Sequence, residues 1–240
     1  MMPAAGYSRM PGGGIARRPL HVIILADCSG GMKGEKMQAL NYAIADMLPH
    51  LEAWERDQEQ AQVFIRAIAF ATEPRWHIAD PVPVDGMRWV PLQPVAKGLT
   101  NMGPAFRLAA QALAPGTIER RALRPAIILV TDGLATDPPG EFEAGLAALM
   151  DQPAGRSALR LSVAIGRDAQ SEALTQFIGD PSVPVLVADS TEDIADRLVA
   201  ASLALSRMSE TGADRGAVAR RLFGLPEGGM PSVFSQDTIV

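Results

Sequence analysis

Residues 20–32 read LHVIILADCSGGM, a nearly continuous apolar run that gives way to polar residues and glycines. The apolar part, 20–26, shows little alternation of polar and apolar positions, which is typical of a strand buried on both faces. Strands of that kind belong to parallel sheets that are covered by helices. Asp27 ends the run, so the sequence predicts a buried strand with polar side chains at its carboxyl end.

Similar segments recur along the chain and alternate with stretches of helical periodicity. Strands are predicted at 62–71, 75–79, 124–130, 159–165 and 183–187, and helices at 35–51, 104–114, 141–150, 169–178 and 191–208. The segment 75–79 follows Pro74 and fits a hairpin-like edge strand. The alternation predicts an α/β fold: an open, mostly parallel six-stranded sheet with one antiparallel edge strand and helices on both faces.

The segments that flank this core differ from it in composition. Residues 1–18 are rich in Gly, Pro and Ala and predict a flexible lead-in, so the folded domain is expected to span 19–208. Residues 209–240 lose the apolar periodicity and predict a flexible tail with at most one short helix, at 215–223. Within the domain, the proline-rich segment 81–94 is expected to be an extended surface loop.

Composition excludes several classes of protein. The chain has 240 residues, a net charge of −5, one cysteine and three histidines. These counts exclude a disulfide framework, a cysteine-rich zinc module and a histidine-based zinc site. The acidic balance argues against nucleic acid and an anionic membrane surface as partners. No apolar run approaches the roughly 18 residues of a membrane span, and no secretory apolar region is found, so a cytoplasmic location is expected.

Oxygen-bearing side chains follow the predicted strands at one end of the sheet. Asp27 and Ser29 come after the first strand, Asp132 after the strand 124–130, and Thr100 shortly before the helix 104–114. Ligands of such sheets bind beyond the carboxyl ends of the strands. A set of carboxylates and hydroxyls, without thiolates or imidazoles, is suited to Mg²⁺ or Mn²⁺.

The order Asp27-x-Ser29-x-Gly31, then Thr100, then Asp132 resembles the metal-ion-dependent adhesion site (MIDAS) of von Willebrand factor type A (VWA) domains. That motif is Asp-x-Ser-x-Ser with a distant Thr and a distant Asp. The resemblance implies a Rossmann-like VWA fold in which Ser29 and Thr100 ligate the metal through their hydroxyls. Asp27 and Asp132 would hold it directly or through water. An acidic residue of a protein partner would fill the remaining position.

One residue departs from the motif, and the wider surroundings suggest a subgroup. Gly31 stands where the family has its second serine, so one hydroxyl ligand is missing. Either a water or backbone carbonyl takes its place, or the metal affinity is low. The stretches 27–34 and 131–137 resemble bacterial VWA proteins of the tellurium-resistance (TerY-like) group. That resemblance implies a cytoplasmic protein in a stress-response system with kinase and phosphatase partners.

Two enzyme classes compete with this interpretation. A haloacid-dehalogenase-type phosphohydrolase also has an Asp after its first strand and needs Mg²⁺, but it requires a second carboxylate two residues on, where this chain has Ser29. A nucleotide-binding Rossmann protein would use the glycines of 29–34, but Asp27 would repel the pyrophosphate. The residues predicted at this end of the sheet also lack a nucleophile–base pair, so the sequence favours a binding module over an enzyme.

Three other residues have simpler interpretations. Cys28 is expected to be a small buried filler, and Asp137 to begin the turn before Pro138 and Pro139. His77 is expected to be a surface residue on the edge strand.

Overall fold

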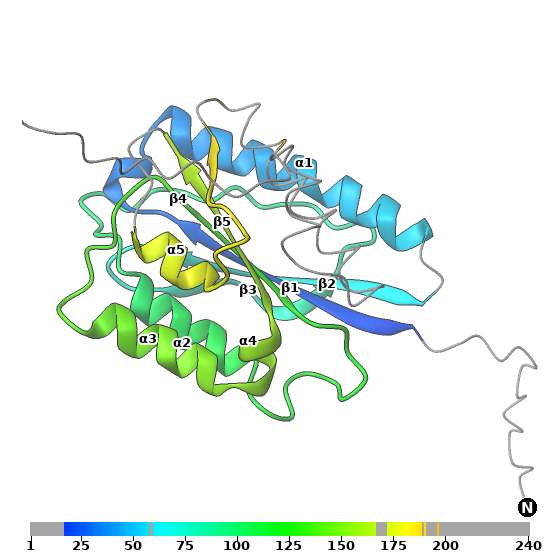
Figure 1. Cartoon of the computed structure of the whole chain (residues 1–240). Coiled ribbons are helices and arrows are strands. Elements are labelled where there is room, and N and C mark those ends of the chain that lie inside the picture. The colour runs from blue at the N-terminus through cyan, green and yellow to red at the C-terminus, as the bar shows by residue number, and fades with distance from the viewer. Residues whose placement is uncertain (1–16, 58–59, 167–171, 189, 191–195, 197–240) are drawn as a thin grey trace, which may run out of the picture.

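The computed structural model describes residues 17–57, 60–166, 172–188, 190 and 196. Its six-stranded sheet has the order β3-β2-β1-β4-β5-β6 (Figure 1). The strands are β1 (Arg18–Asp27), β2 (Ala61–Phe70), β3 (Arg75–Pro83), β4 (Ala126–Thr131), β5 (Leu159–Ile165) and β6 (Leu186–Ala188). All neighbouring pairs are parallel except β2 and β3, so β3 is an antiparallel edge strand.

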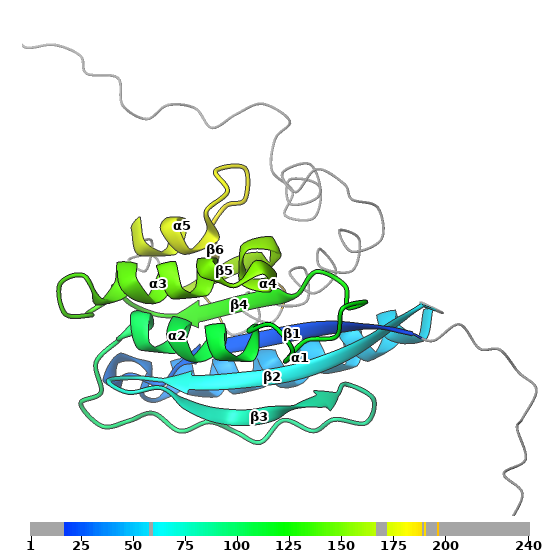
Figure 2. The same cartoon turned by 90° about the horizontal axis from the view of Figure 1, so that it is seen from below.

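Helices cover both faces of the sheet. They are α1 (Glu35–Asp57), α2 (Met102–Ala112), α3 (Glu141–Asp151), α4 (Pro153–Ser157) and α5 (Glu172–Ile178), with a 3-10 turn η1 (Gly30–Met32) before α1. Figure 2 shows α2 and α3 in front of the sheet and α1 behind it. The predicted fold class is confirmed: the central strands β1, β4 and β5 are buried along nearly their whole length, as the uninterrupted apolar run of β1 indicated.

Several element boundaries differ from the sequence prediction. Helix α1 continues six residues past the predicted end at Leu51, because Trp54 extends the buried face beyond Pro49. Strand β3 continues to Pro83 instead of ending at Ala79, since an edge strand tolerates proline where no partner needs its N–H. The short helix α4 was not predicted.

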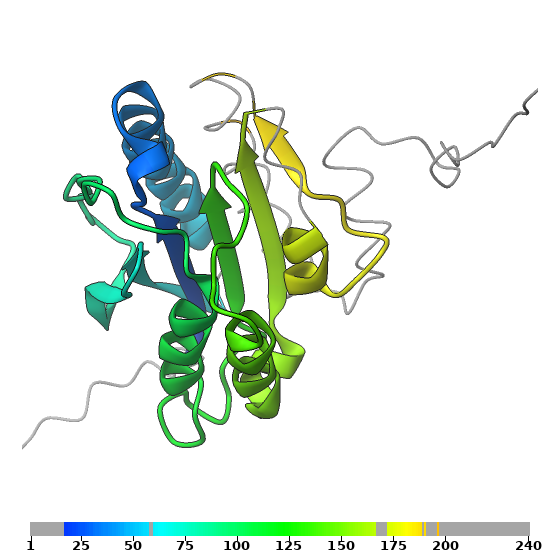
Figure 3. The ribbon, with the colours of Figure 1, turned by 90° about the vertical axis from the view of Figure 1, so that its left-hand side faces the viewer.

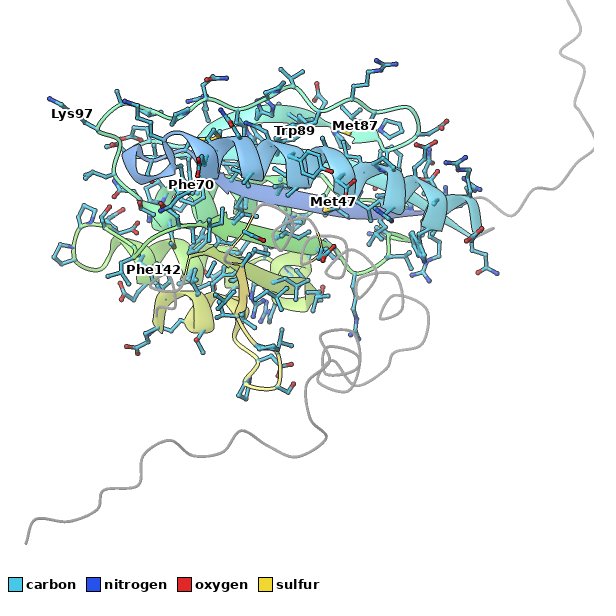
Figure 4. All side chains as sticks on the ribbon, turned by 90° about the horizontal axis from the view of Figure 1, so that it is seen from above. Met47, Phe70, Met87, Trp89, Lys97 and Phe142 are labelled. Atoms are coloured by element: carbon cyan, nitrogen blue, oxygen red, sulfur yellow. The ribbon has the colours of Figure 1, made fainter. Side chains whose placement is uncertain are left out.

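The proline-rich segment is not only a surface loop, as the sequence suggested. Val84 and Leu92 are buried in the core. The side-chain amide of Asn41 on α1 donates to the Leu92 carbonyl, and its Oδ1 accepts the Leu92 N–H. The same Oδ1 also accepts the indole N–H of Trp89 at 2.9 Å. His77 on β3 contacts the Val90 carbonyl at 2.8 Å. Figure 2 shows the segment running along the outer side of β3, and Figure 4 shows Trp89 beside α1.

Three sequence predictions concern segments that lie outside the described residues, apart from Arg17, Arg18 and Asp196. These are the lead-in 1–18, the helix 191–208 and the tail 209–240. None of the helices among the described residues combines the length and apolar character that a membrane span requires.

The layer formed by α2, α3 and α5 is held together by close backbone contact and by aromatic rings. Gly103 on α2 and Gly145 on α3 face each other, and a β-carbon on Gly145 would overlap the backbone carbonyl of Gly103. Phe106 of α2 packs edge-to-face on Phe142 of α3 and is stacked on Phe177 of α5. This contact fixes the position of α2, whose N-terminus lies at the carboxyl end of the sheet.

Replacing Gly145 by Ala should therefore force α2 and α3 apart. We expect the Gly145→Ala variant to lose about 1–3 kcal/mol of unfolding free energy through overpacking. The exposed neighbour Ala147, changed to Ser, should stay within about 0.5 kcal/mol of the wild type. Urea denaturation followed by circular dichroism measures both values. Equal stabilities for the two variants would contradict the proposed helix contact.

Cys28 follows β1 directly and is fully buried, as predicted. Its backbone N–H donates to the Phe70 carbonyl at 2.6 Å, and its carbonyl accepts from the Val95 N–H at 2.7 Å. Burial raises the pKa of the thiol to about 11, although the charge of Arg75 lowers it. The thiol is therefore both protonated and inaccessible at neutral pH.

We expect this single thiol to resist an aromatic disulfide reagent at pH 7.5 in the native protein. Addition of denaturant should release one equivalent of thiol per chain, because the chain has one cysteine. The absorbance of the released thiolate reports both phases. Rapid stoichiometric labelling without denaturant would contradict the burial of Cys28.

Candidate metal centre

The candidate site is at the carboxyl end of the sheet, where β1 and β4 end side by side. The strand register pairs Ala26 of β1 with Val130 of β4, so the next residues, Asp27 and Thr131, lie level across the two strands. Figure 3 looks onto this end of the sheet, with α1 on one side and α2 and α3 on the other. The loops that follow β1 and β4 therefore share one edge.

Asp27 connects these two loops through a fully buried carboxylate. Its Oδ1 accepts the backbone N–H of Ser29 at 2.7 Å, and its Oδ2 accepts the hydroxyl of Thr131 at 2.6 Å. Both oxygens thus help to fix the loop geometry.

The surroundings of Asp27 act on its ionisation in opposite directions. Burial raises the pKa of Asp27 above its ordinary value, and the hydrogen bonds from Thr131 and Ser29 lower it. The negative charge of Asp132 raises the pKa further. The two carboxylates therefore repel each other, and a cation that is close to both would be stabilised by both.

Asp132 is held from two sides. The side chain of Asp132 is only 6% exposed, and its Oδ2 accepts a hydrogen bond from the ammonium group of Lys36 on α1. A β-carbon on Gly31 would lie 3.0 Å from Oδ2 and 3.2 Å from Oδ1 of this carboxylate. The turn η1, the start of α1 and the loop after β4 therefore meet at Asp132.

Thr100 reaches the same edge from the loop before α2. Its backbone N–H donates to the hydroxyl of Thr136 at 2.7 Å, and its carbonyl accepts the Thr136 N–H at 2.9 Å. A β-carbon on Gly133 would lie 3.9 Å from Oγ1 of Thr100. The Thr100 hydroxyl is thus adjacent to the loop that carries Asp132, and neither bond to Thr136 uses it.

Backbone contacts bind the loop before α2 to the loop after β1. The N–H of Gly30 donates to the carbonyl of Gly98 at 2.9 Å. A β-carbon on Gly30 would lie 3.4 Å from the backbone nitrogen of Lys97. Lys97 itself extends away from the ribbon in Figure 4. All three loops that carry the candidate residues are therefore in mutual contact.

Asp137 has a role that the sequence analysis missed. Besides lying next to the turn at Pro138, its carboxylate accepts the backbone N–H groups of Met102 (2.9 Å) and Gly103 (2.7 Å). It thus satisfies two free N–H groups in the first turn of α2 and binds that helix to the loop after β4. The cap lies about 35 residues from α2 along the chain, so local spacing could not reveal it.

The four candidate residues form a set of two carboxylates and two hydroxyls, contributed by Asp27, Ser29, Thr100 and Asp132. Among the described residues, no three His, Cys, Asp or Glu side chains gather into a metal-binding group. Metal binding at this edge would thus need the hydroxyls of Ser29 and Thr100 as well as the carboxylates. Such hard oxygens suit Mg²⁺ and similar ions.

Lys36 was also missed, although a signal for it exists in the sequence. The chain contains only three lysines, Lys33, Lys36 and Lys97, beside 19 arginines. All three lie in or next to the loops predicted to carry the site. The net charge, which sums lysine with arginine, does not reveal this distribution.

Comparisons with known proteins bear on the fold. The sequence matches no protein-family model and no curated protein sequence. Among solved structures, a von Willebrand factor type A protein from Catenulispora acidiphila is 18% identical, with a TM-score of 0.59 over 80% of this chain and 43% of that one. VWA2, the ArnB paralog of Sulfolobus acidocaldarius, is 17% identical, with a TM-score of 0.53 over 77% and 45% of the two chains.

Another similar structure is proximal thread matrix protein 1 of the mussel byssus, with a zinc-occupied MIDAS motif. It is 15% identical, with a TM-score of 0.58 over 80% of this chain and 48% of that one. The chain spans less than half the length of each of these three structures. Together with the strand order, these similarities show that the chain has the von Willebrand factor type A fold.

Proposed function

We propose that this chain is a metal-dependent protein-binding module, which holds a divalent cation at the carboxyl end of its sheet and binds an acidic residue of a protein partner. The observation that carries the proposal is the mutual contact of the three loops that bear Asp27 with Ser29, Thr100, and Asp132. The zinc-occupied MIDAS motif of proximal thread matrix protein 1 supports a divalent ion at this place in the fold.

The residues present fit such an ion. Ser29 and Thr100 would hold it through their hydroxyls, and Asp27 and Asp132 directly or through water. When bound, the cation supplies a positive centre that attracts an incoming carboxylate. Its preferred identity in this proposal is Mg²⁺ or Mn²⁺, because all four side chains offer hard oxygen donors.

The remaining residues of the site keep these donors in place. Thr131 fixes Asp27, and Thr136 fixes the backbone of Thr100 so that its hydroxyl is available. Asp27 and Ser29 are buried, and Thr100 is only 7% exposed. Attraction between charges is stronger in such partly desolvated surroundings than in bulk water.

Binding is favoured over catalysis by the surroundings of Asp27. A phosphohydrolase of the haloacid-dehalogenase type would need a second acid two residues after its aspartate nucleophile, and Ser29 stands at that place instead. The resemblance of 27–34 to TerY-like proteins supports a cytoplasmic, bacterial stress-response or tellurium-resistance setting as part of this proposal.

Removal of the Thr100 hydroxyl tests the metal site directly. We expect Thr100→Val to weaken Mg²⁺ or Mn²⁺ binding at least tenfold in calorimetric titration, because a ligand is lost. The unfolding free energy should change by less than about 1 kcal/mol, since the bonds to Thr136 use the backbone of Thr100.

Thr117→Val makes the same chemical change beyond the opposite end of α2 and serves as the matched control. Its hydroxyl binds the carbonyls of Ala112 and Ala114. This variant should bind metal as the wild type does. If Thr100→Val retained wild-type affinity, Thr100 would not be a ligand.

Partner binding should depend on the same hydroxyl and on the cation. Immobilised wild-type protein is expected to retain a partner from a lysate of its source cells in the presence of Mg²⁺ and to release it in EDTA. Thr100→Val should retain little in either buffer, and Thr117→Val should match the wild type. Retention that is indifferent to EDTA would exclude a metal-bridged contact.

A further inference from the structure

Lys36 is a cation in a place where an unpaired cation would be unfavourable. It is the second residue of α1, whose N-terminus carries the positive end of the helix dipole. Its ammonium group is bound to Oδ2 of Asp132, and the Asp132 side chain is only 6% exposed. A carboxylate with so little contact with water needs a counter-charge. The chain itself supplies that charge.

Gly31 makes room for this pairing. The β-carbon of any other residue at position 31 would press against both oxygens of Asp132, at 3.0 and 3.2 Å. The carboxylate therefore fills space next to Gly31 while it accepts the Lys36 ammonium. The absence of a side chain at position 31 leaves space for the Asp132 carboxylate, and the Lys36 ammonium binds that same carboxylate.

We propose that Lys36 is the resident counter-ion of Asp132, and that a divalent cation binds at the site only in competition with it. This inference rests on the metal-dependent function proposed above. A divalent ion at Asp132 would share one carboxylate with the ammonium group, and the repulsion of like charges lowers its affinity. Withdrawal of the ammonium therefore accompanies metal binding.

Lysine suits a counter-ion that a metal ion can displace from Asp132 better than arginine does. Lysine carries a compact point charge on a flexible stem, whereas arginine forms a rigid fork that binds carboxylates through two bonds. The Lys36 side chain is 43% exposed, so its ammonium can move into solvent. A chain with 19 arginines and three lysines uses lysine at this contact.

The test compares the divalent affinities of three proteins by calorimetric titration with Mg²⁺, Mn²⁺ and Zn²⁺ at fixed pH and ionic strength. Lys36→Met keeps the aliphatic stem and removes the charge. Lys33→Met removes the same charge from an exposed residue three positions earlier. We expect Lys36→Met to bind at least tenfold more tightly than the wild type, and Lys33→Met to stay within about twofold of it.

The outcomes separate this inference from the proposed function. Equal affinity of Lys36→Met and the wild type would overturn the competition and leave the metal site standing. If no protein bound any of the ions, the metal-dependent function would fail. The pairing of Lys36 with Asp132 would then be tested by a double-mutant cycle, which compares the melting temperatures of Lys36→Met, Asp132→Asn and the double variant with that of the wild type. Non-additive losses support the pair as a permanent counter-ion, and additive losses overturn it.

Discussion

Both oxygens of the Asp27 carboxylate accept hydrogen bonds, one from the backbone of Ser29 and one from the hydroxyl of Thr131. A carboxylate with no exposure is stable only with such partners, so the loop after β1 and the end of β4 cannot separate without exposing or orphaning it. The pairing of β1 with β4 sets the distance between the carboxyl ends of these two strands. The hydrogen bonds of Asp27 then fix the two following loops relative to each other. The positions of Ser29 and Asp132 follow from that relation.

The third loop is fixed by a different means. Thr136 and Asp137, both in the loop after β4, bind the backbone of Thr100 and of the first turn of α2. Helix α2 is in turn held against α3 at Gly103 and Gly145. The packing of α2 against α3 on one face of the sheet thus helps to fix the start of α2, and with it the loop that carries Thr100.

The parts of this arrangement that depend on local pattern could be predicted from the sequence. Uninterrupted apolar runs identified β1 and β4, and their polar ends identified the edge at which Asp27 and Asp132 lie. The contacts of Asp137 and Lys36 could not be predicted from local pattern, because each partner is distant in sequence. For Lys36 the sequence offers only the position of the chain's three lysines in or next to the predicted loops. Helix α1 is longer than the sequence predicted, because Trp54 extends its buried face beyond Pro49. The metal ligands themselves remain a prediction.

The segment between β3 and α2 has a consequence for the chain's behaviour at high concentration. An open sheet ends in strands with unpaired backbone groups, which can recruit strands of other molecules. Here the edge at β3 is bordered by this segment, which is held by Asn41 through Trp89 and Leu92 and contacts His77. The opposite edge strand, β6, has only three residues. Within the part of the chain that the structure describes, neither edge offers a long free template, so this architecture discourages strand-to-strand aggregation.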